Sequence, residues 1–384
     1  MPLSSPEWIA KLPIKDQSNL DAALSFLQEI SVEDRVAIIY DPDGDGISAA
    51  AVTVRALKKW RGKRPEYIHP FPFSRGYVAD DLPEQLKKLG VTKLITLDKS
   101  VDQMGVPFLL RLGEACETLI IDHHRVVTPL QMQGVIIAKP DIIWETESSS
   151  FPTAMFAYTL FSHFMDVTDS DWIACIGIVS DAAYPRWKDF VDASLMRGNY
   201  PVMDVPFENA FGRLSGMIYA TGALSSRQLP EVLDLLIEAN SPKVMLDSGF
   251  MSLVAIMEEE MNFWLERLPN EMEYFPELEL HIGKVKPRHN IKSILINKLS
   301  QKMPNQTILL LEEFKDKILI SGRRQDFKVP INVLLETATR GLPEANGGGH
   351  VPAAGGIIRA EDEAIFMERV KAFLRAHAAS AAQT

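Results

Sequence analysis

Short apolar runs alternate with amphipathic segments along the first part of the chain. The apolar runs have the length and the β-branched content of buried strands, and they occupy residues 36–40, 66–71, 93–97, 117–121 and 135–139. The segments between them place apolar residues at helical spacing, over residues 46–60, 80–90 and 107–115. This alternation predicts a doubly wound α/β fold with a parallel sheet, in which ligands bind beyond the carboxyl ends of the strands.

The pattern becomes helical after Ser148 and returns to α/β near Leu278. Helices are predicted over residues 148–164, 171–184, 230–239 and 251–268. Strands are then predicted over residues 279–285, 306–314 and 315–323, and helices over residues 329–341 and 361–379. We therefore expect an α/β domain over residues 1–190, a helical connector over 191–275 and a smaller α/β domain over 276–384, with the active site in the cleft between the two α/β domains.

The composition is that of an ordinary globular protein, with a formal net charge of −11 at pH 7. This charge argues against extensive electrostatic binding of duplex nucleic acid, although it is compatible with a nuclease that has a local basic groove. No apolar run is long enough to span a bilayer, and residues 1–16 lack the pattern of a signal peptide. We therefore expect a cytoplasmic protein that does not bind membranes.

Carboxylates directly follow three of the predicted strands. The first strand is followed by Asp41, Asp43 and Asp45, the third by Asp98, and the fourth by Asp122, His123 and His124. Because the carboxyl ends of parallel strands meet at one edge of a sheet, these groups can converge. Clustered oxygens favour hard divalent ions, and imidazole shifts the choice toward manganese or zinc. Paired ions are typical of phosphoryl hydrolysis, so the pattern suggests a two-metal site.

Each cluster also has a simpler interpretation. The acidic string is compatible with a polar Asx/Gly turn, whereas a calcium EF-hand is disfavoured because its twelfth position is Val52 instead of Glu. Asp98 alone is compatible with an ordinary turn residue. Two adjacent histidines cannot face the same way in an extended chain, so one is a candidate metal ligand and the other a candidate substrate contact. Asp181 ends an apolar helix, either as a helix-end residue or as a metal ligand.

A glycine run near the C-terminus is a candidate phosphate site. Gly347, Gly348 and Gly349 precede His350, and we expect a loop whose backbone N–H groups approach a phosphate or carboxylate. Arg323 and Arg324 end a predicted strand and add guanidinium groups that suit phosphate. The alternatives are a flexible glycine loop and a solvated strand end.

Taken together, these motifs resemble those of the DHH phosphoesterase superfamily, in the branch with a glycine-rich DHH-associated C-terminal domain. The motifs DPDGDG, LD, DHH and SD occur in the family's order, and SGRR and GGGHVPAAGG follow them. That branch contains the RecJ-type single-strand exonucleases and the small oligonucleotide and cyclic-dinucleotide hydrolases. The resemblance covers nearly the whole chain and implies a DHH catalytic domain over residues 1–190 and the associated domain over residues 276–384.

The resemblance also implies roles for individual residues. The implied metal ligands, with Asp98 bridging two ions, are Asp43, Asp45, Asp98, His123 and Asp181. Asp41 is a further candidate ligand, because it lies near the place where many members have His. The implied ions are Mn²⁺ with Mg²⁺ as a substitute. His124 is expected to face the substrate, and Asp122 to orient the histidine pair. The residues implied to hold a substrate phosphate or terminal nucleotide are Arg323, Gly347, Gly348, Gly349 and His350, and Arg324 stays a candidate from its place at the strand end. The sequence departs from the family at Ile39, where many members have His, and at Lys99, a cation next to Asp98.

The implied function is hydrolysis of single-stranded DNA or RNA from one end by a two-metal mechanism. One alternative is the same chemistry on short oligoribonucleotides, cyclic dinucleotides or phosphorylated adenosine. The acidic composition favours this alternative, as does a length too short for the additional oligonucleotide-binding fold of full-length bacterial RecJ enzymes. Another alternative is a non-catalytic scaffold in a replication or repair assembly. The expected partner is single-stranded nucleic acid or a short oligonucleotide, and the helical connector is a candidate docking site for a protein.

Overall fold

The computed structural model describes residues 12–71, 80–124 and 131–381. The chain divides into two compact units, residues 1–254 and residues 255–384. Within the described ranges, no helix is long and apolar enough to cross a membrane. Most of the segment on which the signal-peptide expectation depends, residues 1–11, lies outside these ranges.

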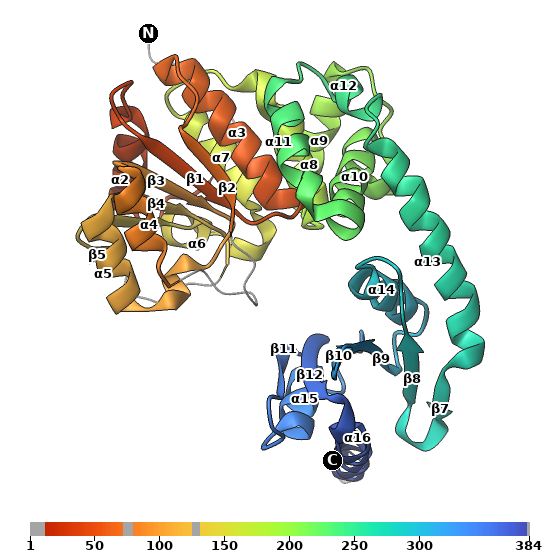
Figure 1. Cartoon of the computed structure of the whole chain (residues 1–384). Helices are drawn as coiled ribbons and strands as arrows, with labels where there is room; N and C mark the ends of the chain where they lie inside the picture. The colour runs from red at the N-terminus through yellow and green to blue at the C-terminus, as the bar shows by residue number, and fades with distance from the viewer. Residues whose placement is uncertain (1–11, 72–79, 125–130, 382–384) are drawn as a thin grey trace. The chain divides into compact units, whose positions relative to one another are not determined.

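The first unit is built on a six-stranded sheet in the order β2-β1-β3-β4-β6-β5 (Figure 1). All neighbouring pairs are parallel except β5 with β6, which is antiparallel. The strands are β1 (Val36–Tyr40), β2 (Tyr67–Pro70), β3 (Lys93–Leu97), β4 (Glu117–Ile121), β5 (Gln131–Met132) and β6 (Val135–Ala138). The central strands β1 and β3 are buried along their whole length, which explains their continuous apolar sequences. The predicted parallel α/β sheet is confirmed.

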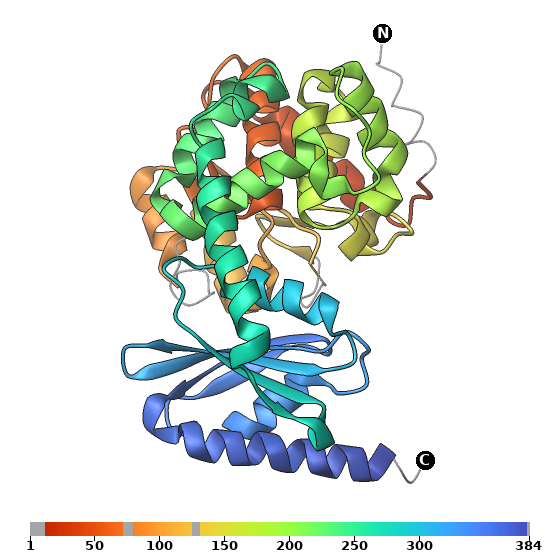
Figure 2. The ribbon, with the colours of Figure 1, turned by 90° about the vertical axis from the view of Figure 1, so that its right-hand side faces the viewer.

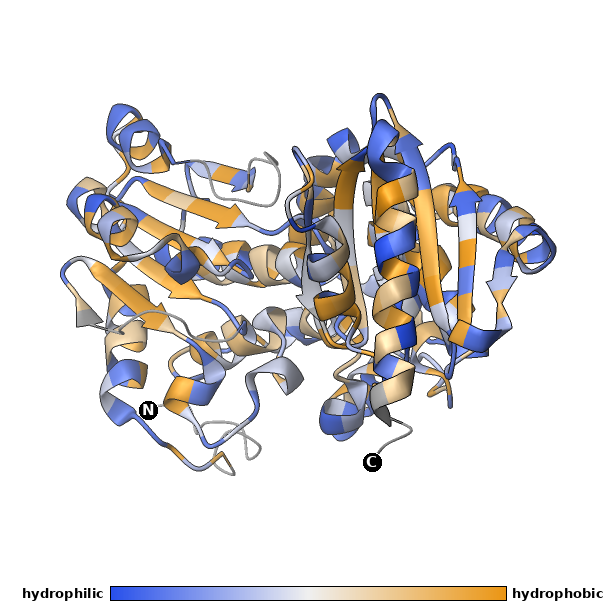
Figure 3. Cartoon of the chain, turned by 90° about the horizontal axis from the view of Figure 1, so that it is seen from below, coloured by the Kyte–Doolittle hydropathy of each residue, from blue (hydrophilic) through white to orange (hydrophobic). Residues whose placement is uncertain are grey.

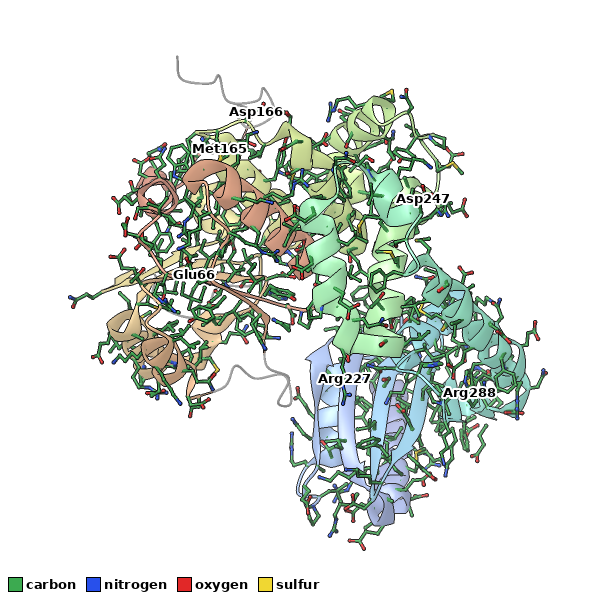
Figure 4. All side chains as sticks on the ribbon, turned by 45° about the horizontal axis from the view of Figure 1, so that its top comes forward. Glu66, Met165, Asp166, Arg227, Asp247 and Arg288 are labelled. Atoms are coloured by element: carbon green, nitrogen blue, oxygen red, sulfur yellow. The ribbon has the colours of Figure 1, made fainter. Side chains whose placement is uncertain are left out.

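Helices cover both faces of this sheet. One face packs against α4 (Leu82–Leu89) and α5 (Val106–Ala115), and the other packs against α2 (Gln17–Glu29), α3 (Gly44–Arg61) and α7 (Thr153–Ser162). Alternation along β1 sends Ala37 and Ile39 to the first face and Ile38 to the second. Side chains fill the space between the sheet and its covering helices (Figure 4).

More helices extend the second layer. They are α8 (Asp171–Ser180), α9 (Tyr184–Arg197), α10 (Ala210–Ser225), α11 (Leu229–Glu238) and α12 (Pro242–Leu246). Helix α8 packs against α3, α7 and α10, and α11 packs against α3. Buried residues such as Leu214, Met217 and Leu236 therefore share one core with the sheet. Short helical segments complete the unit: η1 (Val101–Met104), α6 (Pro140–Ile143), η2 (Ser148–Ser150), η3 (Thr168–Ser170), η4 (Pro206–Glu208) and η5 (Ser226–Gln228).

The second unit contains its own six-stranded sheet, in the order β11-β12-β10-β9-β8-β7. Only the pair β8 with β9 is parallel in this sheet. Its strands are β7 (Glu273–Phe275), β8 (Leu280–Val285), β9 (Thr307–Phe314), β10 (Lys317–Arg323), β11 (Asn346–His350) and β12 (Ala353–Arg359). In Figure 3 several strands have long orange stretches, and buried side chains of β8, β9, β10 and β12 contribute to the core of this unit.

Four helices and two short turns accompany the second sheet. They are α13 (Met251–Glu271), η6 (Pro276–Leu278), α14 (Lys292–Lys302), α15 (Ile331–Thr339), η7 (Ala360–Asp362) and α16 (Glu363–Ala381). Helices α15 and α16 share a core cluster with the sheet, and Figure 2 shows α16 running along it. Helix α14 contacts β9 and β10. A smaller α/β unit near the C-terminus was predicted, and it is confirmed.

The expectation of a loop at the glycine run is wrong, because Gly347, Gly348 and Gly349 lie in strand β11. The run pairs with β12, and glycine is needed there because helix α15 and β12 approach its backbone closely. A Cβ atom on Gly347 would lie 2.7 Å from the carbonyl oxygen of Leu335. Gly349 has φ +142° and would place a Cβ atom 2.7 Å from the carbonyl oxygen of Ala353. At Gly348 the nearest atom would be 3.9 Å away.

We therefore expect opposite outcomes for two neighbouring substitutions. Gly347→Ala should lower the free energy of unfolding by roughly 1–3 kcal/mol, because its methyl group meets helix backbone that cannot move independently. Gly348→Ala should change it by no more than about 0.5 kcal/mol. Thermal and urea unfolding of both variants check this, and equal losses at the two positions would contradict the packing explanation.

Candidate metal centre

The site lies at the carboxyl edge of the first sheet, where β1, β3 and β4 are adjacent. The sheet hydrogen bonds continue one residue beyond each strand: the N–H of Asp41 donates to Leu97 O, and that of Asp98 to Ile121 O, both at 3.1 Å. The N–H of Asp122 likewise donates to Ala138 O at 3.2 Å. The three predicted clusters are therefore held by the sheet itself, side by side at one edge.

Asp45 lies in the first turn of α3 and is completely buried. Its two carboxylate oxygens accept the backbone N–H groups of Thr153, at 2.6 Å, and Ala154, at 2.9 Å. These N–H groups open helix α7 and have no partner inside that helix, so the carboxylate satisfies them and interacts favourably with the helix dipole. Gly177 of α8 makes the room, since a Cβ atom there would lie 2.5 Å from Asp45 Oδ1.

Asp98 lies beside Asp45 in a left-handed backbone conformation, with φ 58°. Its buried Oδ1 accepts a hydrogen bond of 2.9 Å from the hydroxyl of Thr153. The same oxygen lies 3.4 Å from His123 Nε2, and that nitrogen lies 3.2 Å from Oδ2 of Asp181. Asp181 itself follows the last turn of α8. One imidazole nitrogen therefore stands between two carboxylates that come from widely separated parts of the sequence.

Two sets of ligand atoms converge to metal-binding spacing in the described part of the chain. One consists of Asp98, His123 and His124, and the other of Asp45, His123 and Asp181. In each set the ligand atoms lie within 4.8 Å of one another. His123 belongs to both sets, so the cluster is continuous.

Electrostatics indicate that this cluster lacks a positive charge. Burial, followed by the negative charge of its neighbours, raises the pKa of Asp45 to about 7 and that of Asp181 to about 8. The same causes raise the pKa of Asp98 well above its usual value. Burial lowers the pKa of His123, so this imidazole tends to stay neutral. Oxygen ligands with one neutral imidazole fit a divalent ion such as Mn²⁺, which would allow all three acids to ionise.

Asp122 is balanced differently, by a buried lysine. Lys139 is fully buried, with its ammonium group 2.8 Å from Asp122 and 3.0 Å from Asp102. The other oxygen of Asp122 contacts Nδ1 of His124 at 2.7 Å. Burial alone would raise the pKa of Asp122, but the contact with His124 and the charge of Lys139 lower it below its usual value. That contact in turn raises the pKa of the half-exposed His124.

Asp41 and Asp43 are near this cluster but belong to neither ligand set. Asp43 caps α3, because its Oδ1 accepts the N–H of Gly46 at 2.9 Å. Asp41 lies 3.5 Å from the ammonium group of Lys99. The structure thus brings Asp45, Asp98, His123 and Asp181 together and gives the first two acids of the loop other contacts.

The candidate phosphate contacts of the second unit differ in availability. The guanidinium group of Arg324 is buried and bound to Glu279 and Asp326, at 2.6 and 2.7 Å, so it is committed to internal ion pairs. Arg323 is half-buried, and its Nε donates to Asn297 Oδ1 at 2.7 Å. Of the predicted glycines, Gly348 alone would accept a Cβ atom without a close contact, the nearest atom being Glu336 Oε1 at 3.9 Å, and the side chain of His350 lies outside the described part of the chain.

Sequence reasoning missed Thr153 and Lys139. Lys139 directly follows β6 at the same carboxyl edge, and this position was a usable signal. Thr153 is the first residue of helix α7, and it donates hydrogen bonds to Asp45 and Asp98, which are distant from it in the sequence. Nothing in the local sequence indicates that contact.

Two family profiles match this chain, one in each of its two parts. The profile of the DHH family, N-terminal domain, matches residues 35–171, and that of the DHHA1 domain matches residues 285–376. The single-stranded-DNA-specific exonuclease RecJ of Haemophilus influenzae is 25% identical over 176 residues, which are 45% of this chain and 29% of that relative. The aligned segment thus spans under a third of the relative's length.

Solved structures agree on the fold. RecJ from Thermus thermophilus in complex with Mn²⁺ has a TM-score of 0.68 at 21% identity, covering 97% of this chain and 56% of that one. An exonuclease RecJ bound to manganese has a TM-score of 0.66 at 20% identity, covering 97% and 96%. The two family profiles cover more than half of the chain, in the order of the two units. The chain therefore belongs to the DHH family, in the RecJ-like branch that carries a DHHA1 domain.

Proposed function

We propose that this protein is a metal-dependent phosphodiesterase that hydrolyses single-stranded DNA or RNA from one end. The observation that carries the proposal is the convergence of Asp45, Asp98, His123 and Asp181, two buried acids and one partly exposed acid around one imidazole, with no cationic side chain among them in the described chain. A cluster of this kind destabilises the fold unless an ion binds, so it is best understood as a functional site. The relatives named RecJ support single-stranded nucleic acid as the substrate class.

The ions that suit this site are Mn²⁺ and Mg²⁺, held by Asp45, Asp98, His123 and Asp181. When bound, such ions supply Lewis acidity: they neutralise phosphate oxygens and activate water. Thr153 and the first turn of α7 orient the acids by hydrogen bonding to Asp45 and Asp98. His124 is partly exposed, is oriented by Asp122 and has a raised pKa, so it is suited to donate a proton to a phosphate or leaving-group oxygen.

A second candidate substrate class is short: oligoribonucleotides, cyclic dinucleotides or phosphorylated adenosine. The observation that favours it is the net charge of −11, which opposes long contact with a polyanion. In the second unit, the buried and paired Arg324 removes one candidate phosphate contact and leaves Arg323 as the better one. The chemistry at the metal centre is the same for both classes.

The substrate class is tested by Mn²⁺-dependent hydrolysis of 5′-labelled and 3′-labelled single strands, ranging from dinucleotides to long oligonucleotides. We expect shortening of long strands from one end. Asp98→Asn should lower kcat/KM by at least about 100-fold, because a ligand should cost no less than an outer-shell partner. Asp21→Asn, an exposed acid on α2, is the surface control. Cleavage of the shortest species alone would select the small-substrate class, and no metal-dependent cleavage would leave the scaffold hypothesis.

Asp98→Asn, which should lower activity, should raise the stability of the metal-free protein. Asp98 has a folded-state pKa above its unfolded value, so its favourable contribution is complete at low pH and is lost as the pH rises through the folded pKa. Asp98→Asn keeps the hydrogen bond from Thr153 and suits the left-handed backbone. In EDTA it should therefore raise the free energy of unfolding by roughly 1–3 kcal/mol near pH 8, and by less near pH 5.

Saturating Mn²⁺ should reverse this order, because the parent binds the ion more tightly than the variant and gains about 4.1 kcal/mol at 1,000 times its Kd. Thermal unfolding with EDTA and with Mn²⁺ measures both effects. If the variant were less stable than the parent in EDTA at the higher pH, Asp98 would not carry an uncompensated charge.

Thr153 offers a test of the orienting hydrogen bond alone. Thr153→Val removes the hydroxyl that donates to Asp98 and keeps the backbone N–H that donates to Asp45. Mn²⁺ affinity measured by titration calorimetry should fall by about 10- to 100-fold. Thr153→Ser restores the hydroxyl and should bind Mn²⁺ like the parent. Equal losses in both variants would point to helix packing as the cause.

A further inference from the structure

Lys99 is the feature of the metal centre that the proposed reaction does not use. It directly follows Asp98 at the carboxyl end of β3, and its ammonium group lies 3.5 Å from Oδ1 of Asp41. Both side chains are largely enclosed, with 23% of Lys99 and 22% of Asp41 exposed. The pair is therefore part of the site and is not a solvated surface contact.

The first two acids of the loop lie beside this lysine, and the charge of Asp43 also acts on Asp45, Asp98 and Asp181. Burial and then the negative charge of Asp43 raise the pKa of Asp41, while the charge of Lys99 opposes the rise. This pattern identifies Asp41, Asp43 and Lys99 as electrostatic neighbours. Neither of the two converging ligand sets in the described chain includes Asp41 or Asp43. Ile39, two residues earlier, has no side-chain donor atom.

We propose that the Lys99 ammonium group takes the place of a second divalent ion beside Asp41 and Asp43, so that each chain binds a single ion, at Asp45, Asp98, His123 and Asp181. This inference rests on the proposed metal-dependent function and specifies its metal content. It differs from the two ions that the resemblance to the family implies.

The physical reason is charge repulsion within a small volume. Paired catalytic ions stand about 3.5–4 Å apart and share a ligand, here expected to be Asp98. A lysine next in sequence to that ligand, and already paired with Asp41, places its positive charge where the second ion would need to bind. The like charges repel strongly in a partly enclosed site. The ammonium group still presents positive charge to a phosphate, but it gives no Lewis acidity.

Removing the charge should open the second position. Lys99→Gln keeps a side chain of similar length and adds a neutral oxygen beside Asp41, Asp43 and Asp98, a set of hard oxygen donors that suits Mn²⁺. Lys99→Arg keeps the charge. Lys58→Gln is the matched control, because it removes a lysine from another ion pair, with Glu238 at 2.9 Å.

The experiment measures Mn²⁺ bound per chain by equilibrium dialysis with elemental analysis, together with the electron paramagnetic resonance spectrum. The parent, Lys99→Arg and Lys58→Gln should each bind one ion and give an uncoupled six-line signal. Lys99→Gln should bind two ions and give the broadened spectrum of a coupled pair.

The outcomes separate this inference from the proposed function. Two ions in the parent, with hydrolysis intact, would overturn the inference and leave the function standing. A single ion in both the parent and Lys99→Gln would overturn the role of Lys99. No bound Mn²⁺ in the parent would overturn both proposals. Far-ultraviolet circular dichroism of each variant confirms that the comparison is made on folded protein.

Discussion

The constraint on which the site depends is the close clustering of three carboxylates, two of them buried, at one edge of a parallel sheet. Asp45, Asp98 and Asp181 lie around His123; Asp45 and Asp98 are buried, and the side chain of Asp181 is 23% exposed. Each ionised acid in such surroundings costs several kcal/mol unless it is compensated. The first turn of α7 donates hydrogen bonds to Asp45, and Gly177 leaves room for that side chain. Asp98 adopts a left-handed backbone conformation. These features have a common explanation if an ion completes the site.

The chain compensates its acids in two ways. Asp122 and Asp102 are neutralised internally by Lys139, which is as buried as they are. That part of the site is complete without a ligand and holds His124 in a defined orientation. The acids around His123 have no such partner in the described structure, and their raised pKa values reflect this difference. Lys99 pairs with Asp41 in the same way as Lys139 pairs with Asp122, but next to the acids that have no such partner.

The sequence predicts the fold well, because strands buried on both faces and amphipathic helices leave a strong local signal. It also predicts which strand ends carry acids, and hence where they converge. It does not reveal Thr153 or Lys139, whose roles depend on contacts with distant segments. The glycine run was expected to be a loop, because glycine is typical of loops. It lies in strand β11 instead, where Gly347 allows helix α15 to pack closely. The sequence also does not show that Arg324, unlike its neighbour Arg323, is buried and forms an ion pair with Glu279.

The metal centre is tested most directly by the position of Mn²⁺ in a crystal of this protein, determined from anomalous diffraction at the manganese edge. We expect a strong peak enclosed by Asp45, Asp98, His123 and Asp181, at ligand distances of about 2.0–2.3 Å. A peak elsewhere, or none at this cluster in crystals grown with saturating Mn²⁺ at neutral pH, would contradict this expectation.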